Sequence, residues 1–262
     1  MFTALELATE NYADTIDRTL GIIDSGSEDP EAYFLVAWSW RVFGLCHLLG
    51  TADVEPFVDC LRRSAQARLA FLEKVRDGLT CEPAYRCASK NIAFTAAVAA
   101  GDMRTAREIA MRSPTSHIAS VEYEDDFLFF HLMHRLSVAP DDVAGHTAIL
   151  ARWKDVLEGG ESGQLAACHA IVTRDSDEFA AGFDALLGEH QERLAKYRES
   201  PTFDAELFAA EGRVYVEAIA VLRFAELHGL PTKREYPLVP SIARVPLVDT
   251  PLEPGAWRRR PA

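Results

Sequence analysis

Basic residues are scarce in this sequence relative to acidic ones. The 262 residues include 27 lysines and arginines against 40 aspartates and glutamates, which gives a formal net charge of −13. Binding to nucleic acid generally needs clustered lysine and arginine side chains that neutralise the phosphates, so the surplus of acid excludes a general nucleic-acid binder. It favours a soluble protein, or one that captures something basic. With 48% hydrophobic and 26% charged residues, the composition is otherwise that of an ordered globular protein.

Cysteines and long apolar runs are also limited. The five cysteines are odd in number and scattered through helical patterns, which favours free thiols in a reducing cytosol over a disulfide framework. The first residues lack the basic and apolar regions of a secretory signal. No stretch has the roughly eighteen uninterrupted apolar residues of a membrane span. We therefore expect a cytoplasmic protein that does not interact with membranes.

Motifs of catalytic sites are missing as well. The sequence has no Gly-x-Ser-x-Gly elbow, no phosphate-binding loop and no Gly-x-Gly-x-x-Gly motif. His131 and His134 lie three residues apart on one expected helix face, with Glu124 or Asp125 as a neighbouring carboxylate, but neither Glu-x-x-His nor His-Glu-x-x-His occurs. Two helical histidines without such a motif are more often structural. We predict no enzyme, no cofactor and no metal site, although metal binding by His131 and His134 stays open.

A period of 3.6 residues in the apolar positions runs through nearly the whole chain up to residue 229 and predicts an all-α fold. The expected helices include residues 5–20, 30–50, 54–75, 83–100, 177–198 and 203–227. Runs of β-branched residues with strict alternation, which indicate strands, are missing. The aromatic residues of Trp38-Ser39-Trp40 and of the segment from Phe127 to Phe130 are interpreted as core packing, because they have helical spacing in apolar surroundings.

Three short turns recur in the middle of the chain, at residues 100–102, 139–141 and 173–175. Each closes an apolar helix and supplies an aspartate, Asp102, Asp141 or Asp175, that we expect to cap the next helix. These aspartates are 39 and 34 residues apart, which is close to the period of two-helix repeats. We predict roughly ten helices in stacked antiparallel α-hairpins, similar to a degenerate helical repeat.

Prolines mark the end of the helical region. Seven of the thirteen prolines lie in the last 33 residues, where they prevent a helix from continuing. The same segment holds too many apolar residues for a free linker, such as Tyr236, Val239 and Val245. We therefore expect a single all-helical domain over residues 1–229. Residues 230–262 should form an extended tail packed on the helices that frays only near residues 257–260.

Acidic charge is concentrated in two parts of the sequence. Residues 1–30 carry seven acids and one base, and residues 121–210 carry eighteen acids and seven bases. If the hairpins stack, the turns that hold Asp141 and Asp175 share one edge and form an acidic strip. Capping and the helix dipole alone explain much of this pattern. The remainder predicts a surface for a basic partner, formed by Glu122, Glu124, Asp125, Asp126, Asp141, Asp142, Asp175, Asp177 and Glu178.

Several segments resemble one known family. They are residues 166–175 (AACHAIVTRD) with the following Glu178-Phe179 and Leu186-Leu187, residues 225–231 (AELHGLP), residues 236–240 (YPLVP) and the Ala-rich segment from Ala96 to Arg107. In these segments the sequence is similar to the immunity protein 49 family of bacterial polymorphic toxin systems. The resemblance implies a cytoplasmic, all-helical inhibitor that needs no catalytic residues. Such an inhibitor binds a co-encoded secreted toxin and occludes its active site.

Charge and resemblance are consistent with each other. An acidic inhibitor can occlude a basic, nucleic-acid-directed toxin by mimicking phosphate charge, but the toxin could equally act on protein, NAD or the cell wall. The expected partner is a cognate toxin, for which a basic surface is one of the possibilities, and homodimer formation stays open. Two alternatives also stay open. One is a cytoplasmic helical-repeat scaffold that binds a peptide or a regulatory protein on its concave side. The other is a helical-bundle enzyme that uses His131, His134 and nearby carboxylates.

Overall fold

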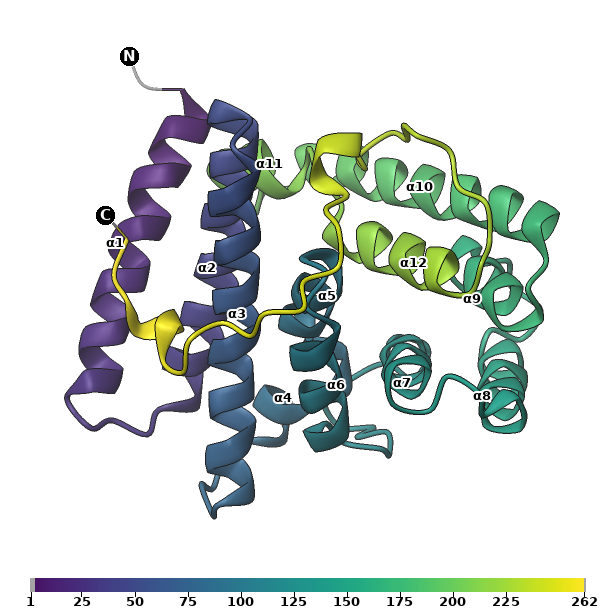
Figure 1. Cartoon of the computed structure of the whole chain (residues 1–262), viewed down its shortest axis with the longest axis horizontal. Helices are drawn as coiled ribbons and strands as arrows, with labels where there is room; N and C mark the ends of the chain where they lie inside the picture. The colour runs from purple at the N-terminus through teal and green to yellow at the C-terminus, as the bar shows by residue number, and fades with distance from the viewer. Residues whose placement is uncertain (1–2, 262) are drawn as a thin grey trace.

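The computed structural model describes residues 3–261, and within that range it contains helices and no β-strand. Figure 1 shows the helices packed against one another, with the last part of the chain crossing in front of them as an extended segment. The all-α fold predicted from the 3.6-residue period is confirmed. The α-helices are α1 (Ala4–Asp24), α2 (Pro30–Thr51), α3 (Val54–Arg76), α4 (Pro83–Arg86), α5 (Ile92–Ala99), α6 (Met103–Arg112), α7 (Glu124–Val138), α8 (Val143–Val156), α9 (Gly163–Thr173), α10 (Ser176–Arg198), α11 (Ala205–Glu211) and α12 (Val216–Leu227). Three short 3-10 helices are η1 (Ala88–Lys90), η2 (Ser241–Ala243) and η3 (Ala256–Arg258).

Helices α1, α2 and α3 lie side by side at the N-terminal end of the molecule (Figure 1). Each begins at a polar residue whose side chain accepts a hydrogen bond from the first turn: Thr3, Asp29 and Asp53. These caps satisfy backbone N–H groups that have no partner inside the helix, and they fix where each helix starts. Gly44 of α2 lets α3 approach closely, because a Cβ atom at that position would lie 2.8 Å from the Cβ atom of Cys60.

Helix α2 is the one helix in residues 3–261 that has the length and apolar composition of a membrane span, and 72% of its most apolar window is buried. It packs between α1 and α3 and also contacts α5 and α11. A helix that is apolar on all sides is expected where neighbours cover it on all sides. Its one arginine, Arg41, is also buried.

We predicted one continuous helix over residues 83–100, and this prediction is wrong. The structure divides the segment into α4, η1 and α5. Asn91 lies at the second break, and its side chain bonds to other parts of the chain. Its Nδ2 donates to Ser113 Oγ at 2.8 Å, and its Oδ1 accepts from Arg68 Nε at 3.3 Å. Beyond the break, α5 is buried over nearly its whole length and packs against α3, α6 and α12. It therefore forms the centre of the core.

The helix predicted over residues 203–227 is also interrupted, between α11 and α12. At the interruption the backbone N–H of Tyr215 donates to the carbonyl oxygen of Leu238, in the tail, at 2.8 Å. A continuous helix would use that N–H in its own hydrogen-bond ladder, so the tail contact takes the place of helical pairing. As a result α11 packs beside α1 and α2, whereas α12 packs on α5.

The three recurring turns are present, but one expected cap is displaced. Asp102 and Asp175 cap the helices that follow them, as predicted. At the middle turn Asp142 is the cap, with Oδ1 accepting from Gly145 N at 3.1 Å, because α8 starts one residue later than Asp141 would require. Helix α7 is viewed nearly end-on in Figure 1, whereas α10 and α12 lie across the view. Successive helices thus change direction and do not form a regular solenoid.

The proline-rich tail runs over the surface of α3 and α5 in an extended conformation (Figure 1), and its final residue, 262, lies outside the described range. One close contact is at Gly101, whose carbonyl oxygen accepts from Val248 N at 3.0 Å. Gly101 has a φ of +74°, and a Cβ atom there would lie 2.3 Å from the carbonyl oxygen of Pro246. Glycine is therefore required at this turn both for its backbone conformation and for the approach of the tail.

Trp257, which we expected in a frayed end of the tail over residues 257–260, is packed on the helices, whereas the three arginines after it are exposed. Trp257 is only 3% exposed, and its ring centroid lies 5.9 Å from that of Tyr33. Its carbonyl oxygen accepts from Trp40 Nε1 at 2.9 Å, and its backbone N–H donates to Gln66 Oε1 at 3.0 Å. Burial of a large aromatic ring and pairing of its backbone groups outweigh the effect of the three arginines that follow.

Candidate functional site

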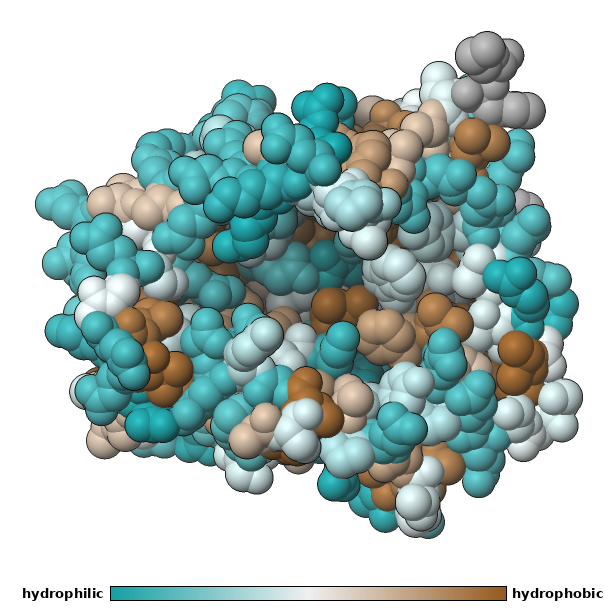
Figure 2. All heavy atoms as spheres, turned by 180° about the vertical axis from the view of Figure 1, so that it is seen from behind, coloured by the Kyte–Doolittle hydropathy of each residue, from teal (hydrophilic) through white to brown (hydrophobic). Residues whose placement is uncertain are grey.

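A cleft lies between α2 on one side and α7, α10, α11 and α12 on the other, with η1 contributing to its lining. Its volume is about 730 Å³. Figure 2, which shows the face opposite to that of Figure 1, has a hollow near its middle with hydrophilic residues at the bottom and apolar residues along its edge. A concave site of this size, with polar groups converging from several elements, is the first candidate for a binding site.

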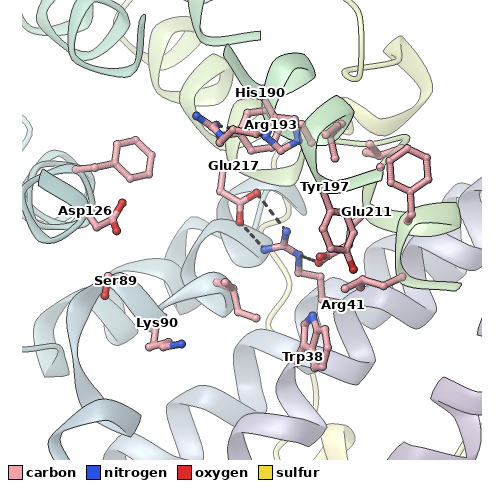
Figure 3. Close-up of a pocket in the computed structure, with 18 of the residues that line it drawn as sticks. Trp38, Arg41, Ser89, Lys90, Asp126, His190, Arg193, Tyr197, Glu211 and Glu217 are labelled. Atoms are coloured by element: carbon pink, nitrogen blue, oxygen red, sulfur yellow. Dashed lines mark hydrogen bonds and ion pairs between the residues drawn. The ribbon is translucent and has the colours of Figure 1, made fainter. Parts of the chain in front are cut away.

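Arg41 lies at the centre of this cleft (Figure 3), with 6% of its side chain exposed. Its Nη1 and Nη2 donate to the two carboxylate oxygens of Glu217 at 2.6 and 3.2 Å, which is the bidentate geometry of a strong guanidinium–carboxylate pair. An oxygen of a second carboxylate group, Glu211 Oε1, lies 3.2 Å from Arg41 Nε. That contact is outside hydrogen-bond geometry, so Nε has no hydrogen-bond acceptor among residues 3–261. One guanidinium thus faces two carboxylates.

The pKa values of these groups show how burial and charge compete in the cleft. Burial opposes the charged form of Arg41, but the carboxylates of Glu217 and Glu211 outweigh it and raise the pKa. Burial also opposes charge on Glu217, but the Arg41 guanidinium holds the pKa of that carboxyl below its ordinary value. For Glu211 burial outweighs the effect of Arg41, so its pKa is raised. Glu217 is therefore the main partner of Arg41, and the charge of Glu211 is only partly compensated.

The interruption between α11 and α12 positions both carboxylates. Glu211 is the last residue of α11, and Glu217 lies in the first turn of α12. Two residues six positions apart would point to different sides of a continuous helix. Because the two helices are separate, both side chains approach Arg41 (Figure 3). The unpredicted break is thus what assembles the polar centre.

Aromatic side chains form much of the wall of the cleft, and four of them are partly exposed: Phe34, Trp38, Tyr197 and Phe208. A fifth ring, that of Tyr215, is covered by His190, with ring centroids 3.6 Å apart and an angle of 6° between the planes. Burial, with a smaller effect of Arg193, lowers the pKa of His190 to about 4. The imidazole is therefore neutral near pH 7 and contributes a stacking surface.

Asp126 and Lys90 lie together in Figure 3, away from Glu211, whereas Arg193 lies beside His190. Burial and the neighbouring Asp125 raise the pKa of the Asp126 carboxyl, and Arg193 acts against them. Lys90 Nζ lies 6.0 Å from the centroid of the Phe34 ring. Of the nine acidic residues predicted to bind a partner, Asp126 is the one that lines this cleft.

The predicted acidic residues next to Asp126 have other roles. Glu122 is only 9% exposed, and its two carboxylate oxygens accept from the backbone N–H groups of Ser89 and Ile118 at 2.9 and 3.1 Å. It therefore holds the chain before α7 in place. Glu124 pairs with Arg152 at 2.7 Å. Asp125, at intermediate exposure, remains at the surface beside the cleft.

The remaining predicted acids belong to the two turns at the start of α8 and α10. Asp142 caps α8 and pairs with Arg135 at 2.6 Å, and Asp175 caps α10. Glu178 lies 2.8 Å from His169 Nδ1 and lines a second groove, formed by α8, α9 and α10. Asp141 and Asp177 are exposed. The predicted acidic surface is therefore divided: Asp126 faces the cleft, whereas the turn residues lie outside it and mainly serve helix ends.

His131 and His134 point to different surroundings. His134 is buried, with Nε2 3.0 Å from Asn91 Nδ2 and its ring against that of Phe94 at 4.5 Å. His131 stacks on Phe127 with centroids 5.2 Å apart. Among residues 3–261 no three histidine, cysteine, aspartate or glutamate side chains form a group that could hold a metal ion. Hydrogen bonding and ring packing thus account for the environment of both histidines.

Sequence reasoning missed Arg41, Glu211, Glu217 and the role of Trp38. One signal was available, because Arg41 is the one lysine or arginine in the apolar segment 30–51, and a charge inside a buried helix needs a partner. The interpretation of Trp38 as core was only partly right. Trp40 is buried at 2% exposure, but Trp38 lines the cleft.

Comparison of the chain with protein-family models, with curated proteins and with solved structures finds no match. The resemblance to the immunity protein 49 family therefore stays a prediction, and the function has to be inferred from the cleft and the charge.

Proposed function

We propose that this protein is an immunity protein that binds a cognate secreted bacterial toxin in the cytoplasm and neutralises it by occluding its active site, without a reaction of its own. The observation that carries the proposal is the cleft, in which partly exposed aromatic side chains surround the carboxylates of Glu211 and Glu217. The net charge of −13 and the segments that resemble the immunity protein 49 family support it further.

The composition of the cleft suits recognition of a protein. Tryptophan and tyrosine contribute strongly to interfaces because they bury a large area and lose little conformational freedom. Carboxylates attract a basic partner and raise its rate of association. The side chains that line the cleft stand on packed helices, so binding requires little ordering of the inhibitor. These features favour tight binding of a basic toxin.

Co-expression tests the proposal. The probe is the secreted toxin encoded next to this gene, placed under an inducible promoter in a bacterial host. We expect growth arrest by the toxin alone and restored growth when this chain is expressed with it.

The substitution Asp126→Lys, in the cleft, should weaken the rescue. Glu192→Lys, on an exposed position of α10 outside the cleft, serves as the matched control and should preserve it. Continued arrest with a folded, soluble wild-type chain contradicts the immunity role.

The size of the cleft favours one alternative, a cytoplasmic scaffold that binds a peptide or a regulatory protein. A volume of about 730 Å³ lies within the range that encloses small ligands and short peptide segments. Calorimetry with the purified toxin separates the two functions. A stable complex that inhibits the toxin supports the immunity role, whereas a toxin that neither binds nor is inhibited favours the scaffold.

A further inference from the structure

Glu211 lacks a full counter-charge in the cleft, and this imbalance indicates the chemistry of the group that binds there. Both Nη atoms of Arg41 are engaged by Glu217, and only Nε approaches Glu211, without a hydrogen bond. The Glu211 and Glu217 side chains are 27% and 17% exposed, so water screens their charges only in part. Two partly buried carboxylates share one guanidinium, and burial disfavours the charge of Glu211. A second cation beside Glu211 would stabilise its charged form and compensate it.

The other basic side chains that line the cleft do not compensate Glu211. His190 is neutral near pH 7 because burial lowers its pKa to about 4. Arg193 lies beside His190, and its charge acts to lower the pKa of the Asp126 carboxyl. Lys90 is exposed and lies on the Asp126 side in Figure 3. The end of the cleft that contains Glu211 therefore remains acidic.

Aromatic rings surround this acidic end. Trp38, Tyr197 and Phe208 line the cleft and are partly exposed, and Figure 3 shows Trp38 and Tyr197 on the same side as Glu211. Aromatic faces attract cations, and the flat guanidinium group stacks on them more favourably than an ammonium group. A carboxylate beside exposed rings therefore suits a guanidinium, which pairs through its edge and stacks through its face.

We propose that the Glu211 end of the cleft receives the guanidinium group of an arginine side chain on the partner protein. The N–H groups of that guanidinium would donate to the Glu211 carboxylate, and its plane would stack on Trp38 or Tyr197. Two guanidinium groups and two carboxylates then balance one another at this end. The inference rests on the proposed binding function and specifies the group that the partner inserts.

Two short peptides test this proposal without the toxin. The probes are a capped Gly-Arg-Gly tripeptide and the same peptide with citrulline, which has nearly the shape of arginine but no charge. The readout is the indole N–H signal of Trp38 in nitrogen-15 NMR spectra of the full chain during titration. We expect a saturable shift with the arginine peptide and binding about tenfold weaker with the citrulline peptide, because the charge-assisted hydrogen bonds are lost. Equal binding of the two peptides overturns the proposal.

Substitutions locate the site. Glu211→Gln keeps the shape and removes the charge, so it should weaken binding of the arginine peptide about tenfold and leave the citrulline peptide unaffected. Tyr197→Leu retains the charge and removes a ring, and it should weaken the arginine peptide to a smaller extent. Glu192→Gln, outside the cleft, is the matched control. Circular dichroism and thermal unfolding verify that each variant folds. If folded Glu211→Gln and Tyr197→Leu both bind the arginine peptide as the wild type does, the site is refuted.

Failure of this proposal and failure of the proposed function give different results. The titration needs no toxin, so loss of the preference for arginine overturns the arginine site even where the chain restores growth. Conversely, a chain that prefers the arginine peptide but leaves the toxin active overturns the immunity role while the arginine site stands.

Discussion

At the scale of single residues, Arg41 connects elements that are far apart in the sequence. It joins α2 to Glu217 of α12, 176 residues away, and lies against Glu211 of α11. A buried ion pair contributes little to stability compared with an apolar replacement of similar shape, but removal of one partner leaves an uncompensated charge. Arg41 therefore has a larger role in the position of α11 and α12 than a surface arginine would have.

Arg41→Ala should lower the free energy of unfolding by about 3 kcal/mol or more, because Glu217 and Glu211 lose their common cation while they remain partly buried. Glu211→Gln should change it by less than about 1 kcal/mol, since Arg41 keeps its bidentate pair with Glu217. Urea unfolding followed by circular dichroism measures both. Equal effects of the two substitutions would show that Arg41 does not discriminate between its carboxylate partners.

The buried histidines predict how stability depends on pH. Burial, with smaller effects of His131 and Arg68, lowers the pKa of His134 to about 3, whereas an unfolded histidine has a pKa near 6.5. Between these values the unfolded chain binds more protons, so the free energy of unfolding falls as the pH decreases below about 6.5, by up to about 1.4 kcal/mol per pH unit for this group. His190 acts in the same direction. His134→Gln should flatten the dependence between pH 7 and pH 5 in urea unfolding, and an unchanged slope contradicts this role.

At the scale of elements, helices whose ends are marked by local signals have nearly the bounds that we predicted. Asp29-Pro30 and Asp53 start α2 and α3 through contacts within three residues, so the sequence alone specifies them. The two interruptions were not predictable in this way. The break at Asn91 depends on Ser113 and Arg68, and the one before α12 depends on Leu238. Partners so distant in sequence leave no local pattern.

The same distinction applies to the candidate site. Asp126 was identified because acidic charge can be counted in the sequence, and it does line the cleft. The carboxylates that face Arg41 could not be identified, because only the interruption between α11 and α12 brings them to one cation. The predicted strip also assumed that the turns of stacked hairpins share an edge, whereas the helices change direction along the chain (Figure 1).

The displaced cap at the middle turn gives a matched pair of substitutions. Asp142→Ala removes the acceptor for Gly145 N and the partner of Arg135, and it should lower the free energy of unfolding by about 1 kcal/mol. Asp141→Ala, one residue earlier and exposed, should change it by less than about 0.5 kcal/mol. Thermal unfolding of the two variants measures the difference. A larger loss of stability for Asp141→Ala than for Asp142→Ala would indicate that Asp141 is the cap.

At the scale of the whole molecule, the tail changes which acidic segments are available to a partner. Residues 1–30 have a surplus of acid in the sequence, but Arg258 and Arg260 of the tail pair with Asp24 and Asp17 of α1. The basic end of the chain thus lies on its acidic beginning and offsets part of that charge. In the cleft, on the face shown in Figure 2, the carboxylates remain only partly compensated.

The tail should also be an important source of stability. Trp257→Ala removes a ring that is 3% exposed and should lower the free energy of unfolding by about 3–5 kcal/mol, as for other buried tryptophans. Arg260→Ala removes only exposed ion pairs and should cost less than about 1 kcal/mol. Denaturant unfolding of the two variants measures the contrast. A small effect of Trp257→Ala would mean that the end of the tail frays after all.

The contact of Trp257 with Tyr33, Trp40 and Gln66 has a consequence for synthesis of the chain. Synthesis proceeds from α1, α2 and α3 towards Trp257, so these helices leave the ribosome well before the ring that covers them. Until Trp257 has been synthesised, the apolar surface of Tyr33 and Trp40 has no cover from the tail. A premature stop shortly before Trp257 would therefore leave that surface open to chaperones and proteases.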